Sequence, residues 1–83
     1  KEKHSVFKGN VEIALPKKEF KLFALLSSKP GKVFTREYIL DQVWGDEVVV
    51  GDRTIDVHIR KLREKIGDEY FKTVKGVGYK FEF

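Results

Sequence analysis

The sequence predicts a small α+β domain in which a β-hairpin, three helices and a second β-hairpin follow one another along the chain. Three observations support this prediction: apolar residues alternate with polar ones near both ends, they recur at helical spacing in three segments between, and glycine, proline and capping residues separate the segments. The 83 residues suit one domain, which we expect to span residues 1–83. Because the chain has no cysteine, apolar packing must stabilise it, and 41% hydrophobic residues suffice for a core.

The first hairpin is expected at residues 4–15. Val11, Ile13 and Leu15 lie at alternate positions, which is the spacing of a half-buried strand. Gly9-Asn10 comes before them and suits a tight turn. The residues that precede this turn therefore form the other strand.

Two helices should follow. The first is expected at residues 16–29, where Pro16 suits the start of a helix and the dense apolar residues indicate burial on more than one side. After the brief apolar stretch Val33-Phe34, the second helix is expected at residues 35–44. Its first residue, a threonine, is a good N-cap, and a glycine ends it.

The third helix is expected at residues 53–66, after a loop at residues 45–52, and it has two chemically opposite faces. One narrow stripe is apolar and should face the core: Ile55, Ile59, Leu62 and Ile66. The outward side carries cations around one apolar residue: Arg53, Val57, Arg60, Lys61 and Arg63. In a DNA major groove, such cations bind guanine edges or phosphates, and valine packs on a thymine methyl group. The alternative is a solvated charged face with one stray valine. Two acids, Asp56 and Glu64, share this side, and Asp56 has the reach to orient a neighbouring arginine.

The second hairpin is expected at residues 70–83, with Lys75-Gly76-Val77-Gly78 as its turn. With Lys72 and Lys80, this hairpin is basic. The second and third helices have the layout of a helix-turn-helix, and a basic hairpin beside it is typical of a wing that reaches a minor groove or phosphates. The alternative is an ordinary edge hairpin with solubilising lysines.

The charge balance favours an anionic partner. Lys and Arg number 17 against 13 Asp and Glu, a formal net charge of +4, which indicates nucleic acid first. No apolar run approaches the ~18–20 residues that span a bilayer, and the charged N-terminus is not followed by a signal-peptide core. We expect a cytoplasmic domain without membrane contact, and a chain that starts with Lys1 is expected to be a fragment.

Enzyme chemistry finds little support, and no cofactor or metal is expected. The chain has no P-loop and no paired-histidine metal motif, and its histidines, His4 and His58, are far apart in the sequence. Asp56 and His58 are two residues apart, so they do not face each other on a helix.

Several stretches occur in the order of a known family: Glu19-Phe20, Pro30-Gly31-Lys32-Val33, Arg36 with Leu40, Val43-Trp44-Gly45, the run from Arg53 to Arg63, and Thr73-Val74-Lys75-Gly76-Val77-Gly78-Tyr79. Together they cover about residues 15–83 and resemble the winged-helix effector domain of OmpR/PhoB-type two-component response regulators. The run from Arg53 to Arg63 and the Gly76-Val77-Gly78-Tyr79 turn are the most specific in combination.

The resemblance implies a winged helix-turn-helix that binds double-stranded DNA, with the third helix as recognition helix and the second hairpin as wing. In the family a four-stranded sheet precedes the first helix, so the hairpin here is expected to be a truncated sheet. Pro16 stands where the family usually has a capping threonine.

The resemblance also implies partners. A receiver domain with a phosphorylatable aspartate would precede this fragment, and head-to-tail pairs would bind direct repeats. The acidic loop with Asp46, Glu47 and Asp52 would touch RNA polymerase, although a loop of solvated charges needs no function.

Residue by residue, the resemblance implies base contacts for Val57, Arg60 and Lys61, and base or backbone contacts for Arg53 and Arg63. It implies contacts with phosphates and sugars for a second set: Trp44, Thr54, His58, Thr73 and Tyr79. Lys75 matches a wing position that enters the minor groove. Like Lys61, it stands where arginine is common, and lysine cannot make arginine's planar fork.

Several of these residues have structural alternatives. Trp44 can belong to the core, His58 can lie at its edge, Tyr79 can pack on the sheet with its hydroxyl in water, and Thr73 can serve strand formation. Two other functions are alternatives to DNA binding: a winged helix whose third helix docks on a partner protein, and a domain that binds double-stranded RNA. Steep salt dependence of DNA binding would favour DNA binding over docking on a partner protein. Competition between DNA and RNA duplexes would distinguish a DNA binder from an RNA binder.

Overall fold

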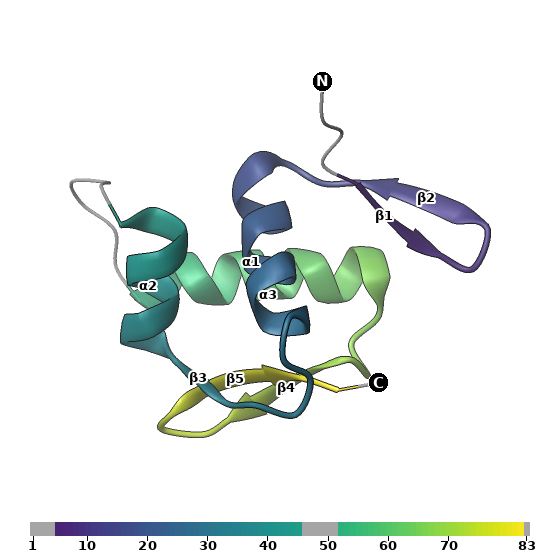
Figure 1. Ribbon diagram of the computed structural model, residues 1–83. Helices are drawn as coiled ribbons and strands as arrows, with labels where there is room; N and C mark the ends of the chain where they lie inside the picture. The colour runs from purple at the N-terminus through teal and green to yellow at the C-terminus, as the bar shows by residue number, and fades with distance from the viewer. Residues whose placement is uncertain (1–4, 46–51, 83) are drawn as a thin grey trace.

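The computed structural model describes residues 5–45 and 52–82 and has the predicted α+β order with one additional strand (Figure 1). Its elements are β1 (Ser5–Lys8), β2 (Val11–Ala14), α1 (Lys17–Ser27), β3 (Phe34–Thr35), α2 (Arg36–Trp44), α3 (Asp52–Ile66), β4 (Phe71–Val74) and β5 (Gly78–Phe81). β1 pairs with β2, and β3, β5 and β4 form a second antiparallel sheet in that order. The helices lie between the N-terminal hairpin and the three-stranded sheet (Figure 1).

The start of α1 shows the effect of its proline. Pro16 precedes the helix in an extended conformation, with φ −57° and ψ 156°, and provides no side-chain cap. The helix therefore begins at Lys17, one residue later than predicted, and it ends at Ser27 rather than at residue 29. Ser28 closes that end, where its hydroxyl donates to the Leu25 carbonyl at 2.6 Å.

The predicted threonine cap of α2 is present. Thr35 Oγ1 accepts a hydrogen bond from the Tyr38 amide at 3.1 Å, which satisfies one of the unpaired donors of the first turn. Gly45 follows the helix with φ −35°, so it ends α2 without the left-handed conformation that glycine often supplies. The loop after it, predicted at residues 45–52, lies mostly outside the described residues.

β3 is the element that the sequence analysis did not assign. Phe34 pairs with Tyr79 and Thr35 pairs with Gly78, which makes β5 the central strand of its sheet. A Cβ atom at Gly78 would lie 1.9 Å from the Phe34 carbonyl oxygen, so only glycine permits this approach. Gly78 consequently belongs to β5 rather than to the predicted turn.

The core forms where the three helices meet the sheet. The predicted apolar stripe of α3 is buried in full, from Ile55 to Ile66. Aromatic side chains fill the space above the sheet, with Phe23 and Phe71 packed edge-on against Phe81 at centroid distances of 5.6 and 5.4 Å. Because burial fixes one stripe of α3, the opposite face must point away from the core.

An ion pair between a buried carboxylate and a partly exposed lysine joins α1 to α3. Glu19 is 3% exposed, and its carboxylate accepts a hydrogen bond from Lys65 Nζ at 2.8 Å. A buried carboxylate is costly without a partner, so this pair fixes where the end of α3 lies against α1.

Within residues 5–45 and 52–82, no helix is long and apolar enough to cross a membrane. The same residues bring together no group of three or more His, Asp or Glu side chains of the kind that holds a metal ion.

Candidate nucleic-acid interface

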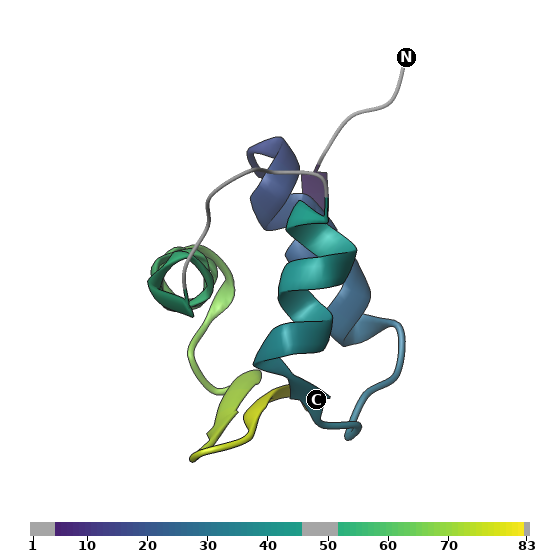
Figure 2. The same cartoon turned by 90° about the vertical axis from the view of Figure 1, so that its left-hand side faces the viewer.

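α3 and the β4–β5 hairpin lie on one side of the molecule. Figure 2 looks along α3 and shows this hairpin below the helix, with both on the same side of α2. Gly76 forms its turn with φ 77°, a left-handed conformation that glycine adopts without strain, and Val77 at the tip is 45% exposed. The outward face of α3 and the hairpin turn at residues 75–77 therefore form one surface, called here the helix–wing surface.

The outward face of α3 carries the predicted cations. Arg53, Arg60 and Lys61 are exposed, and Val57 between them is 47% exposed. Arg60 Nε lies 3.9 Å from the Glu64 carboxylate, with both side chains mostly in water. Such an exposed pair contributes at most about 1 kcal/mol, so an anionic ligand can displace the glutamate at little cost.

Arg63 occupies a different position from the other cations. Its guanidinium donates to the Phe71 carbonyl from Nη2 at 2.8 Å and from Nε at 3.2 Å, and to Thr73 Oγ1 at 2.8 Å. Arg63 therefore joins the second half of α3 to β4. Thr73 accepts this bond and keeps its own hydroxyl proton, so it can still donate to a phosphate oxygen.

Trp44 and His58 pack together at the end of α2. Trp44 is 4% exposed, and its indole lies edge-on to the His58 ring with centroids 4.9 Å apart. His58 Nδ1 donates to the Thr54 carbonyl at 2.8 Å. Because this bond takes the proton of a neutral imidazole, only the imidazolium form of His58 could donate to a phosphate. Trp44 thus belongs to the core and His58 lies at its edge, which are the structural alternatives given for these two residues.

Asp56 connects α3 to two other elements. Its Oδ1 accepts a hydrogen bond from Arg36 Nη1 of α2 at 2.7 Å and another from the Tyr79 hydroxyl of β5. The Arg36 guanidinium also lies over the Tyr79 ring, 5.1 Å from its centroid. Asp56 does orient an arginine, but that arginine comes from α2 and not from the outward face of α3.

The charges of this network follow from its contacts. Burial alone would raise the pKa of the Asp56 carboxyl, but the hydrogen bonds from Tyr79 and Arg36 hold that pKa below its ordinary value. The hydrogen bond to Asp56 raises the pKa of Arg36, and burial followed by the same acid raises the pKa of the Tyr79 phenol. Near neutral pH the network is therefore one carboxylate, one guanidinium and one neutral phenol.

Arg36 is the member of this network that the sequence analysis did not single out. It appeared there only as one position of a resemblance. Arg36 and Asp56 are 20 residues apart and on different helices, so no spacing along a single helix could reveal the pair.

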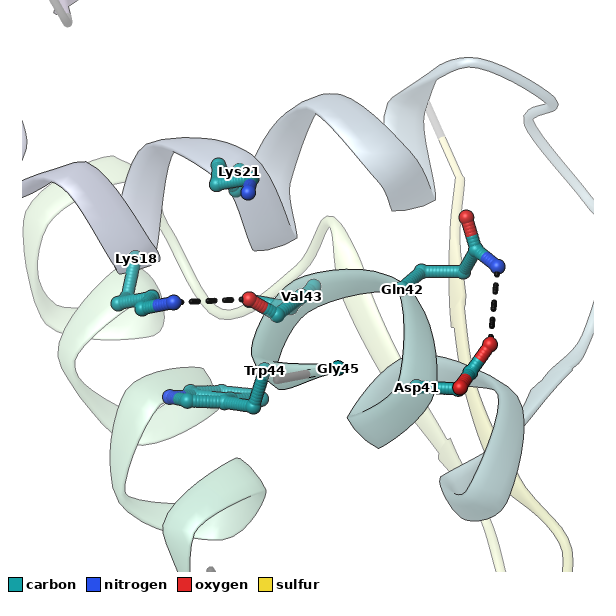
Figure 3. Close-up of a pocket in the computed structure, with 7 residues that line it drawn as sticks. All are labelled: Lys18, Lys21, Asp41, Gln42, Val43, Trp44 and Gly45. Carbon is teal, nitrogen blue, oxygen red and sulfur yellow. Dashed lines mark hydrogen bonds between the residues drawn. The ribbon is translucent and has the colours of Figure 1, made fainter. Parts of the chain in front are cut away.

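A polar hollow of about 400 Å³ lies between α1 and the C-terminal end of α2 (Figure 3). Lys18 Nζ donates there to the Val43 carbonyl at 3.0 Å, which satisfies an acceptor at the end of the helix. The loop that follows contains Asp46 and Glu47, which lie outside the described residues, and the side chain of Asp52 is not described either.

Comparison with known proteins identifies the family of this chain. Residues 10–81 match the family described as "Transcriptional regulatory protein, C terminal". The phosphate regulon transcriptional regulatory protein PhoB of Rhizobium meliloti (strain 1021) is 40% identical over 86 residues, which cover 99% of this chain and 38% of that protein. PhoB of Escherichia coli (strain K12) is 42% identical over 82 residues, 94% of this chain and 36% of that protein. The chain thus spans less than two fifths of these relatives.

Solved structures agree in fold. The response regulator DrrB, a Thermotoga maritima OmpR/PhoB homolog, matches with a TM-score of 0.86 at 40% identity, over 95% of this chain and 38% of that chain. The DNA-binding domain of the response regulator AdeR, in complex with an intercistronic region, matches with a TM-score of 0.82 at 31% identity, over 95% of this chain and 84% of that chain. The predicted winged-helix fold and the predicted absence of catalysis agree with this family of transcription regulators, and the chain belongs to it as a C-terminal DNA-binding domain of the OmpR/PhoB response-regulator type.

Proposed function

We propose that this domain binds specific double-stranded DNA sequences with α3 in the major groove and the β4–β5 hairpin at the adjacent minor groove. The observation that carries the proposal is the helix–wing surface, where exposed cations surround an exposed valine on α3 and a basic hairpin turn projects on the same side. An α-helix fits the major groove of B-DNA, and the neighbouring hairpin is then close to the backbone and the minor groove.

The proposed roles divide by position. Arg60, Lys61 and Val57 contact bases, and Arg53 contacts bases or the backbone. Phosphates and sugars are contacted by residues that lie beside this face: Trp44, Thr54, His58 and Thr73. Tyr79, whose hydroxyl proton is bound to Asp56, contacts them by packing alone. Lys75 contacts the minor groove or its phosphates, and Arg63 acts chiefly by joining α3 to β4.

The whole protein is proposed to be a cytoplasmic response regulator. A receiver domain would precede this one, pairs of domains would bind direct repeats head to tail, and the loop with Asp46, Glu47 and Asp52 would contact RNA polymerase. The relatives are between two and three times as long as this chain, which leaves room for a further domain in the whole protein.

The proposal is tested by selecting duplexes from a random pool with the 83-residue chain. We expect enrichment of one sequence, and an affinity for it that falls linearly with the logarithm of salt concentration by ~0.9 per phosphate contacted. A double-stranded RNA competitor of the same sequence should displace little of it. Binding that is insensitive to salt, or equal for all duplexes, would contradict the proposal.

We expect Val57→Ala to lower affinity for the selected duplex by roughly fivefold, because about 1 kcal/mol of apolar contact with a thymine methyl group is lost. The loss should disappear when that thymine is replaced by uracil, which lacks the methyl group. Titration of the parent and the variant on both duplexes measures the effect. An equal loss on the two duplexes would place Val57 away from any thymine.

We expect Lys75→Ala to weaken binding to all duplexes and to reduce the log–log salt slope by ~0.9. If Lys75 lies in the minor groove, the variant should also lose preference for A·T-rich flanks, whose narrow groove has the most negative potential. Salt titrations on one core sequence with A·T-rich or G·C-rich flanks measure both effects. Lys29→Ala is the matched control, because Lys29 is exposed in the segment after α1 that lies away from α3 in Figure 2. If Lys75→Ala behaves like this control, the hairpin has only a structural role.

A further inference from the structure

Within the described residues, side chains at two positions of α3 form hydrogen bonds to the three-stranded sheet. Arg63 is at one position and bonds to the Phe71 carbonyl and to Thr73. Asp56 is at the other, two turns earlier on the helix, and bonds to the hydroxyl of Tyr79. A helix held at two points along its length has a fixed orientation to the strands that it contacts.

Asp56 is an unexpected residue for a surface that binds DNA. Its side chain is 48% exposed on the helix whose cations would contact DNA. A carboxylate there repels phosphates, so it lowers affinity for every duplex regardless of sequence. A residue with that cost calls for a compensating role, and its bonds to Arg36 and Tyr79 indicate what that role is.

The partners of Asp56 are both groups that bind phosphate when they are released. Arg36 carries a planar guanidinium that suits phosphate oxygens, and its side chain is 30% exposed. The phenol of Tyr79 has one proton, and the carboxylate of Asp56 takes it because a carboxylate can only accept. While Asp56 holds both donors, neither the Tyr79 proton nor the bonded face of Arg36 is available to the DNA backbone.

We propose that Asp56 is a positioning residue for sequence discrimination, which fixes α3 relative to α2 and the wing and keeps Arg36 and Tyr79 from binding phosphates of any sequence. This inference rests on the proposed function, because discrimination requires that α3 contact bases. A domain whose helix and wing keep one relative orientation meets the two grooves only at a matching sequence. A domain without that constraint adapts to many duplexes.

The test is Asp56→Asn, which keeps the size of the side chain and removes its charge. With the duplex selected by the parent domain and a scrambled duplex as probes, we expect affinity for the scrambled duplex to rise and its salt slope to steepen by ~0.9 for each phosphate gained. Affinity for the selected duplex should change less, so that the ratio of the two affinities falls about tenfold, within the range of coupling seen in such networks.

Glu64→Gln is the matched control for charge. Glu64 lies on the same helix and its carboxylate contacts only the exposed Arg60 among the ion pairs of the described residues. The variant should raise the affinity for both duplexes by the same factor and leave their ratio within about twofold. A comparable fall in the ratio for Glu64→Gln would mean that any lost acid has this effect, which would overturn the proposal.

Tyr79→Phe tests the network without any change of charge. It removes only the hydroxyl that bonds to Asp56, so the ratio should fall as in Asp56→Asn, and the double variant should fall no further than the larger single effect. This variant also decides the matter if Asp56→Asn fails to fold by circular dichroism.

Three results would overturn the inference. An unchanged ratio in Tyr79→Phe would show that the network does not support discrimination. A change of preference at one base pair in Asp56→Asn alone, found by repeating the selection, would make Asp56 a direct contact to a base. If instead the parent domain prefers no sequence at all, the proposed function fails together with this inference, and that result is visible before any variant is made.

Discussion

Ile59→Ala is expected to lower the free energy of unfolding by roughly 2–5 kcal/mol, because truncation of a buried isoleucine loses transfer free energy and leaves a cavity. Ile59 is 1% exposed at the middle of the apolar stripe of α3. Small domains have unfolding free energies of about 5–15 kcal/mol, so this single change removes a large share of the total. No other change considered for this domain should affect its stability as much.

Urea unfolding followed by circular dichroism at fixed temperature measures the effect. Val57→Ala is the matched control on the same helix, since Val57 is 47% exposed and its truncation should change stability by about 0.5 kcal/mol or less. Equal midpoints for Ile59→Ala and the parent would mean that the apolar stripe of α3 does not face the core. A large loss of stability in Val57→Ala would mean the same.

The largest effect on binding is expected for Arg60→Ala. Arg60 projects from the centre of the outward face, with its side chain 81% exposed. If it donates two hydrogen bonds to a guanine, its loss should cost ~1–3 kcal/mol of discrimination between the selected duplex and a scrambled one. Affinity for the scrambled duplex should fall much less, because it depends on the sum of phosphate contacts.

Arg60→Lys separates geometry from charge. Lysine keeps the positive charge but cannot make the planar two-bond contact of arginine, so it should retain binding to the scrambled duplex and still lose preference for the selected one. Competition titrations of the parent and both variants on the two duplexes give the comparison. Equal losses on both duplexes for Arg60→Ala would assign Arg60 to the phosphate backbone.

Periodicity predicted most of the fold because most of the chain has a strong local pattern. The stripe from Ile55 to Ile66 fixed the phase of α3, and the same phase placed Val57 and Arg60 outward, as the structure confirms. Thr35 identified the start of α2 through its capping chemistry. These predictions needed only residues within a few positions of one another.

The parts that were missed depend on contacts between distant residues. β3 has two residues, too few for alternation to be visible, and it exists because Gly78 lets β5 approach. The bonds of Arg63 to β4 and of Arg36 to Asp56 join separate elements, so a helical projection showed Arg63 as one more outward cation. A local pattern assigns a face to each side chain, whereas the partner on that face depends on the tertiary structure.

The same distinction applies to the interface. The sequence predicted which residue types share the outward face of α3, and the structure adds that the wing lies on that side. Trp44 and Tyr79, predicted at the DNA backbone, are buried with their rings packed in the protein. Their contacts with the DNA backbone remain predictions, which salt titrations of the kind described for Lys75 can test.

Methylation interference on the selected duplex tests the central claim most directly, because dimethyl sulfate modifies guanine N7 in the major groove and adenine N3 in the minor groove. With α3 in the major groove and the hairpin at the minor groove, methylation of guanines within the selected sequence should block binding. Methylation of adenines in the adjacent flank should weaken it, and Lys75→Ala should remove only the adenine effect. Binding that persists when every guanine N7 of the selected sequence is methylated would contradict the placement of α3.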